Sequence, residues 1–388
     1  MRIAVIAACP FPLARGTPVR ILRMAEALAD RGHDVHVATY HLGEGPVGSG
    51  VTVHRIRDVP SYRKLNPGPS YAKLLRVDPL LVGLTRRLLV ARPFDVVHAH
   101  HYEGVMVARA AQIGRRVPTV YDAHTMLMSE LPYYRLGLPS GLLRRLGAAL
   151  DSFIPRLADH TVCVTDVIRT RLVEDIGMEP RRVSVISNGV EVDHFYPART
   201  PQGPRPPGKT IIFTGNLASY QGIDLMLEAF ARVAAERHDV RLLIATDSGF
   251  DAYEPLAQRL GIRQRIELVS SPGFDQLPGL LAGADVAVNP RVECDGIPVK
   301  LLNYMAAGRA VVSFASSAPG VVHGETGWLA PGGDVAALAE GLRTVLDDPQ
   351  LAARLGAAAR NYVAANVSWR IVAERCETLY RSMIEAGR

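Results

Sequence analysis

Apolar residues along the chain form short continuous runs, and amphipathic stretches separate them. Runs such as residues 1–8 and 210–214 lack the alternation of a half-exposed strand, so they predict strands that are buried in a parallel sheet. Stretches such as residues 19–30 carry apolar side chains at helical spacing and end shortly before a glycine, which predicts amphipathic helices. Strands and helices in alternation predict an α/β fold.

The segment 284–314 shows this order most compactly. Residues 285–289 predict a buried strand, polar residues then break the pattern, and Pro298 is expected at the first helical position. Gly308 ends the predicted helix, and residues 309–314 predict a second strand. In a β-loop-α-β unit the loop lies at the carboxyl edge of the sheet, where open α/β sheets bind ligands.

The start of this helix suits a phosphate group. The backbone N–H groups of Gly296, Ile297 and Val299 have no partner within the helix and point at its N-terminal end. Lys300 follows in the first turn, where the helix dipole disfavours a cation unless an anion shares the site. A bound diphosphate is one interpretation of Lys300, and a solvated lysine with its stem over the helix is the other.

Length and composition predict two domains. The chain has 388 residues, more than a single core normally supports. Five prolines and two glycines fall between residues 197 and 209, which disfavours regular structure there. We therefore predict an N-terminal domain at 1–198, a linker at 199–209, a second domain at 210–365 and a C-terminal helix at 366–388.

Positive charge is concentrated in the first half of the chain. Residues 1–198 carry 25 Lys and Arg against 18 Asp and Glu, whereas the remainder carries 19 against 20. Such an excess suits acidic substrates or anionic lipid, and the aromatic residues typical of nucleic-acid binding do not accompany it. The four cysteines show no metal-ligand spacing, and no signal peptide or apolar run of transmembrane length is found, so a cytoplasmic protein is expected.

Histidines cluster at two predicted strand ends. His98, His100 and His101 follow one another closely, but no carboxylate or cysteine completes a ligand set with them, so no metal is predicted. His124 follows the strand predicted at 118–123. Alone, it is as typical of a structural histidine as of a functional one.

The sequence DGIPVKLLNYMAAG, residues 295–308, resembles the E-x7-E segment of the retaining glycosyltransferases of family 4, which have the GT-B fold. Asp295 and Asn303 stand where the family has its two glutamates. The resemblance implies that Asp295 binds hydroxyls of the donor sugar and that Asn303 binds the ribose. An asparagine retains an acceptor oxygen and adds two donors, but it lacks the charge.

Other segments fit the same family. The first loop carries Gly16 where the family has paired glycines near the donor phosphates and the acceptor, His124 matches a histidine close to the donor sugar, and Gly273 lies in the loop near the base. The largest departure follows Gly215, where Asn216 and Gln221 replace an arginine and a lysine that neutralise the diphosphate. Lys300 would then supply the missing charge.

The resemblance implies two Rossmann-like, doubly wound parallel-sheet domains that face a cleft. It also implies a metal-independent, retaining transferase of hexosyltransferase type, without a cofactor beyond its nucleotide-sugar co-substrate. The catalytic candidates are Asp295, His124 and Lys300. The donor-binding candidates are Gly16, Gly215, Asn216, Gln221, Gly273, Gly296, Ile297, Val299 and Asn303. The acceptor-side candidates are Arg15, Thr17, His100 and Glu130.

Alternative functions remain open at this point. A degenerate family member that binds a sugar nucleotide or a partner transferase without catalysis fits the three amide replacements, and a two-domain sugar-binding protein would normally carry an export signal. The acceptor is a hydroxyl of a glycan, a lipid-linked molecule or a small molecule. Basic residues beside apolar ones favour an anionic or lipid-linked acceptor at the inner face of the plasma membrane, with an arginine-rich soluble surface as the alternative. These residues are Arg63, Lys64, Lys73, Arg76, Arg86 and Arg87 beside 79–84, and Arg144 and Arg145 beside Leu142 and Leu143.

Overall fold

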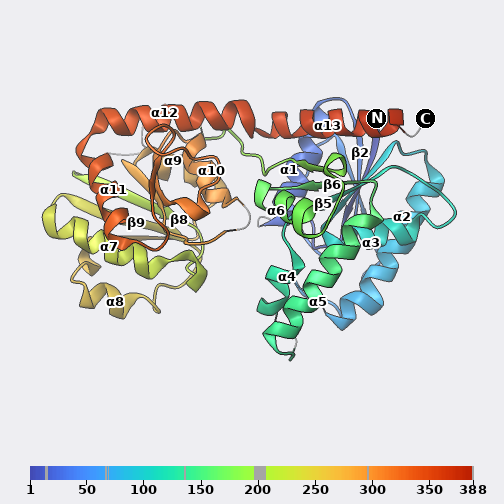
Figure 1. Cartoon of the computed structure of the whole chain (residues 1–388), viewed down its shortest axis with the longest axis horizontal. Helices are drawn as coiled ribbons and strands as arrows, with labels where there is room; N and C mark the ends of the chain where they lie inside the picture. The colour runs from blue at the N-terminus through green and yellow to red at the C-terminus, as the bar shows by residue number, and fades with distance from the viewer. Residues whose placement is uncertain are drawn as a thin grey trace. The chain divides into compact units, whose positions relative to one another are not determined.

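The computed structural model describes residues 1–13, 16–65, 68, 70–134, 137–195, 207–294 and 297–386. The chain forms two compact units. Unit 1 comprises Met1–Gly189 together with the chain from Trp369 onward, and unit 2 comprises Val190–Ser368. Each unit is a parallel sheet with helices on both faces (Figure 1).

Unit 1 has a seven-stranded sheet in the order β3-β2-β1-β4-β5-β6-β7, with every pairing parallel. Its strands are β1 (Arg2–Ala7), β2 (Asp34–Thr39), β3 (Val51–Arg55), β4 (Val96–His100), β5 (Thr119–Ala123), β6 (His160–Cys163) and β7 (Val183–Val185). Its α-helices are α1 (Thr17–Asp30), α2 (Asp78–Ala91), α3 (His101–Ala111), α4 (Leu127–Glu130), α5 (Ser140–Phe153), α6 (Asp166–Thr170) and α13 (Trp369–Ala386).

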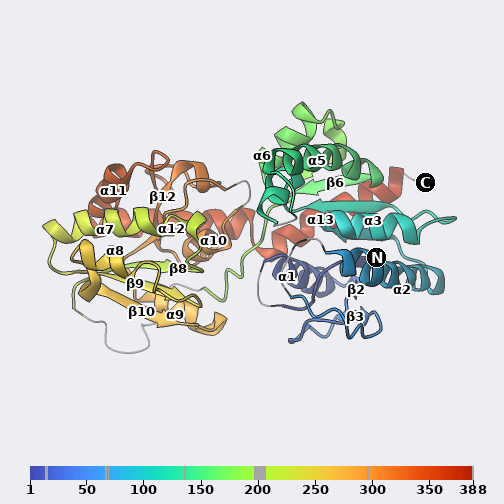
Figure 2. The ribbon, with the colours of Figure 1, turned by 90° about the horizontal axis from the view of Figure 1, so that it is seen from below.

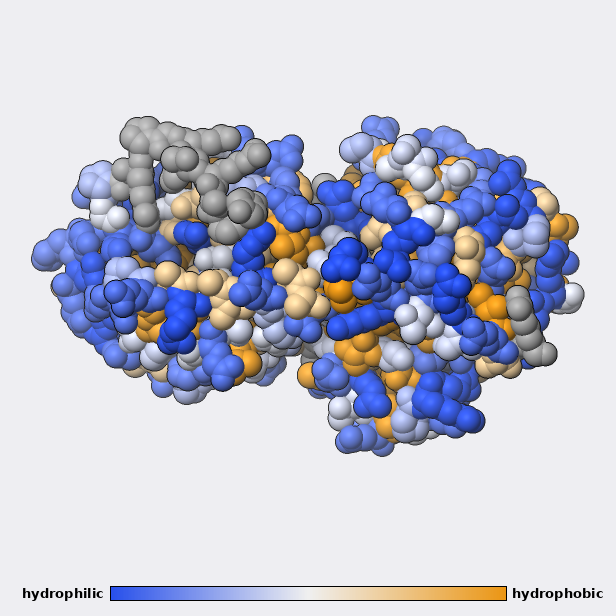
Figure 3. All heavy atoms as spheres, turned by 90° about the horizontal axis from the view of Figure 1, so that it is seen from above, coloured by the Kyte–Doolittle hydropathy of each residue, from blue (hydrophilic) through white to orange (hydrophobic). Residues whose placement is uncertain are grey.

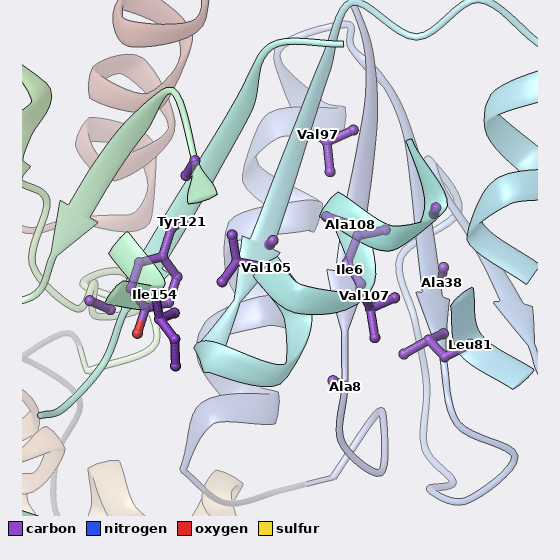
Figure 4. Close-up of a cluster of buried hydrophobic side chains, with 14 of the residues drawn as sticks. Ile6, Ala8, Ala38, Leu81, Val97, Val105, Val107, Ala108, Tyr121 and Ile154 are labelled. Carbon is purple, nitrogen blue, oxygen red and sulfur yellow. The ribbon is translucent and has the colours of Figure 1, made fainter. Parts of the chain in front are cut away.

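Alternate residues of the central strands supply two cores. Ile3 and Val5 of β1 pack on the face that α1 and α13 cover. Ile6 and Val97 pack on the opposite face, against residues of α2, α3 and α5 (Figures 2 and 4). Because both faces are covered, the strands read as continuous apolar runs in the sequence. The last helix of the chain is thus a core element of the first unit.

Unit 2 has a six-stranded parallel sheet in the order β10-β9-β8-β11-β12-β13. Its strands are β8 (Lys209–Thr214), β9 (Val240–Thr246), β10 (Ile266–Ser270), β11 (Val286–Asn289), β12 (Ala310–Phe314) and β13 (Trp328–Ala330). Its α-helices are α7 (Ile223–Glu236), α8 (Glu254–Arg259), α9 (Leu277–Ala282), α10 (Val299–Ala306), α11 (Val335–Asp347) and α12 (Pro349–Asn366).

The β11-α10-β12 unit has the predicted order. β11 and β12 pair in parallel from Val286 to Asn289, and α10 connects them. Pro298 is the N-cap of α10 with φ −61° and ψ 118°, one position earlier than expected. The extended ψ explains the shift, because the helical hydrogen-bond pattern begins only at Val299. The predicted architecture, two doubly wound parallel sheets, is confirmed.

The predicted linker at 199–209 lies largely outside the described residues, since the description stops at residue 195 and resumes at 207. Lys209, its last residue, already belongs to β8. Within the described ranges, every helix is too short or too polar to span a bilayer. The face in Figure 3 is mostly hydrophilic, and its hydrophobic residues lie among hydrophilic ones.

Candidate functional site

The entrance to α10 is the first part of the candidate site. Asp295 and Gly296 lie outside the described residues. Ile297 packs partly into the core, and the exposed Val299 opens the helix. Among the described residues no side chain caps α10, so its first N–H groups are available as donors, as the sequence predicts.

Lys300 carries the charge of this part of the site. Its Nζ lies 4.0 Å from the centroid of the Phe213 ring and donates to Oε1 of Gln221 at 2.5 Å. Burial, together with the nearby charge of Arg291, lowers the pKa of Lys300 to about 7. No carboxylate within the described ranges forms a salt bridge with Lys300. A bound anion would stabilise the ammonium and raise this pKa again.

Asn216 and Gln221 occupy the positions of the expected cations and contact each other. Gln221 is buried and donates from Nε2 to Oδ1 of Asn216 at 3.4 Å, while its Oε1 accepts from Lys300. Oδ1 of Asn216 also accepts from the backbone N–H of Ala218. Gly215 has φ +126°, and a Cβ added there would lie 3.7 Å from Nζ of Lys300. The structure therefore brings Gly215, Asn216, Gln221 and Lys300 together.

Two donor-binding candidates stand apart from this group. Asn303 is buried in α10, and its side chain makes no hydrogen bond to another described residue. The N–H of Gly273 donates to Oε1 of Gln276, and a Cβ added at Gly273 would meet open space. Their assignment to ribose and base stays a prediction.

Unit 1 gathers four histidines at the carboxyl ends of β4 and β5. The parallel register places His100 beside Asp122, and Nδ1 of His100 lies 3.0 Å from Nε2 of His124. His98 directs Nε2 to Oδ2 of Asp122 at 3.1 Å. The rings of His101 and His124 stack with centroids 4.5 Å apart. His98, His100 and Asp122 are fully buried, whereas His124 and His101 lie nearer the surface.

Arg20 of α1 neutralises the carboxylate of Asp122. Its guanidinium contacts Oδ2 at 2.9 Å and also donates to the backbone carbonyls of Ile186 and Ser187. Burial alone would raise the pKa of Asp122, but the charge of Arg20 and the hydrogen bond from His98 outweigh it and hold this pKa well below its usual range. Burial lowers the pKa values of His100 and His124 well below 6.5, so both imidazoles are neutral at pH 7.

Thr17 connects the first loop to this cluster. Its Oγ1 lies 2.7 Å from Nε2 of His101 and 3.5 Å from Nδ1 of His124. His101 has φ +60°, a strained conformation for a residue with a side chain, and such strain is typical of functional sites. A Cβ added at Gly16, the N-cap of α1, would meet open space. Arg15 lies outside the described residues.

The reasoning that no carboxylate completes a metal-ligand set was wrong, because Asp122 does so with His98 and His100. The strand register creates this proximity across 22 residues of sequence. The guanidinium of Arg20 already occupies the carboxylate, however. At an effective dielectric constant near 20, two like unit charges 4 Å apart repel by about 4 kcal/mol, so the guanidinium would repel a divalent ion by about twice that. The residues present therefore fit a metal poorly.

The predicted lipid-facing segment around α2 is partly buried in the structure. Leu81 and Leu84 belong to the core, because the apolar run within 79–84 is the buried face of α2. Lys73 is also buried and pairs with Glu103, while Arg63 pairs with Asp58. Arg76, Arg86 and Arg87 are exposed, so the docking of this segment on lipid stays a prediction.

The second predicted surface segment is partly exposed. Leu143 packs into the core, whereas Leu142, Arg144 and Arg145 face outward on α5. Glu130 ends α4, and its Oε2 accepts a hydrogen bond from the hydroxyl of Tyr134 at 3.2 Å. Within the described ranges Glu130 forms no hydrogen bond to the histidines.

Several residues of the cluster were not predicted as site residues: Arg20, His98, His101, Asp122 and Tyr380. The hydroxyl of Tyr380, on α13, lies 2.6 Å from Nδ1 of His98 across 282 positions of sequence. Asp122 carried a usable signal, since it ends a strand two residues before His124. Arg20 and Tyr380 lie within amphipathic helices, where their spacing is that of ordinary core positions.

Family models match most of the chain. The model described as Glycosyltransferase Family 4 matches residues 14–194, and the model described as Glycosyl transferases group 1 matches residues 208–348. Among curated relatives, a D-inositol 3-phosphate glycosyltransferase of Thermobispora bispora is 28% identical, with 99% of this chain and 95% of the relative covered. A phosphatidyl-myo-inositol mannosyltransferase of Mycobacterium leprae is also 28% identical, with 100% and 98% covered.

Solved structures share the fold. Sucrose-phosphate synthase of Thermosynechococcus elongatus superposes with a TM-score of 0.82 at 20% identity, with 99% of each chain covered. The Anabaena protein HepE in complex with UDP superposes with a TM-score of 0.76 at 18% identity, with 98% of this chain and 100% of that chain covered.

Proposed function

The chain belongs to glycosyltransferase family 4 and has the GT-B fold, and from this premise we propose that it transfers a sugar from a nucleoside-diphosphate donor to a hydroxyl acceptor with retention of the anomeric configuration. The observation that carries the proposal is Lys300, a cation at the start of α10 with a pKa lowered to about 7 and no counter-anion among its described neighbours. A diphosphate would supply that anion.

Unit 2 binds the donor in this proposal. Lys300 and the first N–H groups of α10 stabilise the charge that develops on the departing diphosphate. Gln221 holds Lys300 in place, and Gly215 leaves room for close approach of a phosphate. A UDP complex of the structural neighbour HepE supports a nucleotide-sugar donor.

Unit 1 contributes His124 and the acceptor-side residues. His124 contacts Thr17 through Nδ1 and is neutral at pH 7, so it can exchange hydrogen bonds with sugar hydroxyls without a change of charge. Retention requires no protein nucleophile when the acceptor attacks from the face that the diphosphate leaves. Positioning and charge stabilisation then supply the rate enhancement, and no step requires a metal.

We infer that the acceptor is lipid-linked or anionic and that unit 1 reaches it at a membrane surface through α5. Leu142, Leu146 and Phe153 are 51%, 46% and 60% exposed and recur at i, i+4 and i+11, so they line one side of the helix. We call these three residues the α5 stripe. Arg144 and Arg145 are also exposed, and no acidic residue occurs between 131 and 150. Such a face suits anionic lipid, and the phosphatidyl-myo-inositol mannosyltransferase relative agrees with this acceptor class.

A thermal-shift screen against UDP, GDP, ADP and their glucose conjugates tests the proposal. A ligand at one hundred times its Kd stabilises the protein by about 2.7 kcal/mol. One nucleoside series should raise the Tm of the wild type and leave that of Lys300→Ala nearly unchanged, because a charge-assisted hydrogen bond is worth about 1.5–3 kcal/mol. If no series raises the Tm, the donor assignment fails. Binding without turnover would favour a non-catalytic family member.

A further inference from the structure

A row of buried polar side chains lies behind His124. Hydrogen bonds join the hydroxyl of Tyr380 on α13 to His98, and His98 to Asp122. Asp122 lies 3.5 Å from Nδ1 of His100, which in turn lies within hydrogen-bond distance of His124. Tyr380, His98, His100 and Asp122 are each 0% exposed. Burying a hydroxyl costs free energy unless it is hydrogen-bonded, and the hydroxyl of Tyr380 meets that cost through its hydrogen bond to His98.

Asp122 and Tyr380, the two partners of His98, determine which nitrogen of His98 carries the proton. Asp122 is ionised and can only accept, so Nε2 of His98 carries a proton and donates to it. Burial raises the pKa of Tyr380, so its hydroxyl keeps its proton and donates to Nδ1 of His98 at 2.6 Å. His98 is then the neutral Nε2–H tautomer, and Tyr380 selects it.

The same carboxylate lies next to both outer histidines. Oδ2 of Asp122 lies 3.5 Å from Nδ1 of His100, and Oδ1 lies 3.7 Å from Nε2 of His124. Nε2 of His100 and Oδ1 of Asp122 have no hydrogen-bond partner among the described atoms. Only Oδ2 of the carboxylate receives hydrogen bonds from described residues, and these come from Arg20 and His98. These two residues therefore set the orientation of the carboxylate.

We propose that Tyr380 and Asp122 are positioning residues, which hold the His124 imidazole in the orientation and tautomer used for glycosyl transfer. Tyr380 acts through His98, and Asp122 acts directly on the two outer histidines. The inference rests on the proposed function because it takes His124 to act in glycosyl transfer. The contacts among Tyr380, His98, Asp122 and the outer histidines do not depend on that function. It makes the C-terminal helix α13 part of the transfer machinery as well as part of the core of unit 1.

The test compares Tyr380→Phe with Val372→Ala in the full-length chain. Val372 is also buried on α13 but forms no hydrogen bond through its side chain, so its truncation destabilises the helix without changing the histidines. Tyr380→Phe should lower kcat for transfer from the sugar nucleotide about ten-fold, the size expected for one lost hydrogen bond, with KM within two-fold. Val372→Ala should lower Tm by at least as much and leave kcat unchanged. Equal kcat for Tyr380→Phe and wild type would overturn the proposal.

A double-mutant cycle with His98→Gln tests the path. Glutamine keeps an N–H that can donate to Asp122 but offers Tyr380 no ring nitrogen, so adding Tyr380→Phe to His98→Gln should cost nothing further. Additive losses would contradict action through His98. Nitrogen-15 NMR of histidine-labelled protein reads the tautomers without any turnover, so it separates this proposal from the proposed function. A His98 protonated at Nδ1 in the wild type, or an unchanged His98 signal in Tyr380→Phe, would refute the assignment.

Discussion

Replacing Lys300 with methionine should make the ligand-free protein more stable and abolish its recognition of the donor. Folding lowers the pKa of Lys300 from 10.5 to about 7, chiefly through burial. At 1.36 kcal/mol per pH unit, the folded state therefore penalises the ammonium by about 5 kcal/mol. Methionine removes this penalty but loses the Phe213 and Gln221 contacts, which leaves a net gain of about 1–3 kcal/mol. For a unit of this size, 2 kcal/mol raises Tm by about 4–8 °C.

The pH dependence has a defined sign. Below pH 7 both the folded and the unfolded wild type hold the proton of Lys300, so the penalty is complete. Between pH 7 and 10.5 the unfolded chain binds a proton that the folded chain has released, so wild-type stability rises with pH. The advantage of Lys300→Met should therefore be largest at pH 6 and shrink steadily up to pH 9.5, as measured by thermal unfolding.

Donor binding provides the second readout. A diphosphate stabilises the ammonium, so wild-type affinity for its preferred glucose nucleotide should fall about ten-fold per pH unit above pH 7, and Lys300→Met should bind weakly at every pH. Lys209→Met is the matched control, since Lys209 pairs with Asp285 at the start of β8. It should gain no stability and bind the donor normally. A Lys300→Met protein that is no more stable than wild type at pH 6, or that binds the donor normally, would refute the reasoning.

Three further variants test other parts of the account. Asp295→Ala should leave nucleoside-diphosphate binding near wild type by calorimetry while transfer falls by orders of magnitude, and normal turnover would move the sugar site elsewhere. Arg20→Met should destabilise unit 1 by about 3–5 kcal/mol in denaturant unfolding because it leaves the Asp122 carboxylate unpaired. The double variant with Asp122→Asn should recover part of that stability. Equal stability of Arg20→Met and wild type would contradict this role of Arg20. Leu146→Ser with Phe153→Ser should abolish salt-sensitive co-sedimentation with anionic vesicles without affecting nucleotide binding, whereas undiminished sedimentation would exclude the α5 stripe.

The fold could be read from the sequence because buried parallel strands and amphipathic helices leave local periodic signals. The strand predicted at 285–289 begins one residue later in the structure, at Val286. The apolar run at 79–84 was misjudged for a physical reason. Leu81 and Leu84 are spaced as one face of a helix, and only tertiary packing decides whether that face meets the core or solvent.

The histidine cluster was harder to predict from the sequence than the fold, because residues far apart in the chain form it. The salt bridge between Arg20 and Asp122 spans 102 positions, and the contact between Tyr380 and His98 spans 282. No local pattern encodes such pairs. Lys300 was recognised because a cation in the first turn of a helix is locally unfavourable, and its lowered pKa expresses the same conflict.

Phosphorus-31 NMR of the purified protein with UDP-, GDP- and ADP-glucose and a membrane lipid fraction tests the central claim most directly, since it reports cleavage of the sugar–diphosphate bond whatever the acceptor. The wild type should convert one of the three sugar nucleotides to its free nucleoside diphosphate, and His124→Ala and Lys300→Ala should do so at least ten-fold more slowly. Release of no nucleoside diphosphate from any of the three, above the rate without protein, would contradict the account.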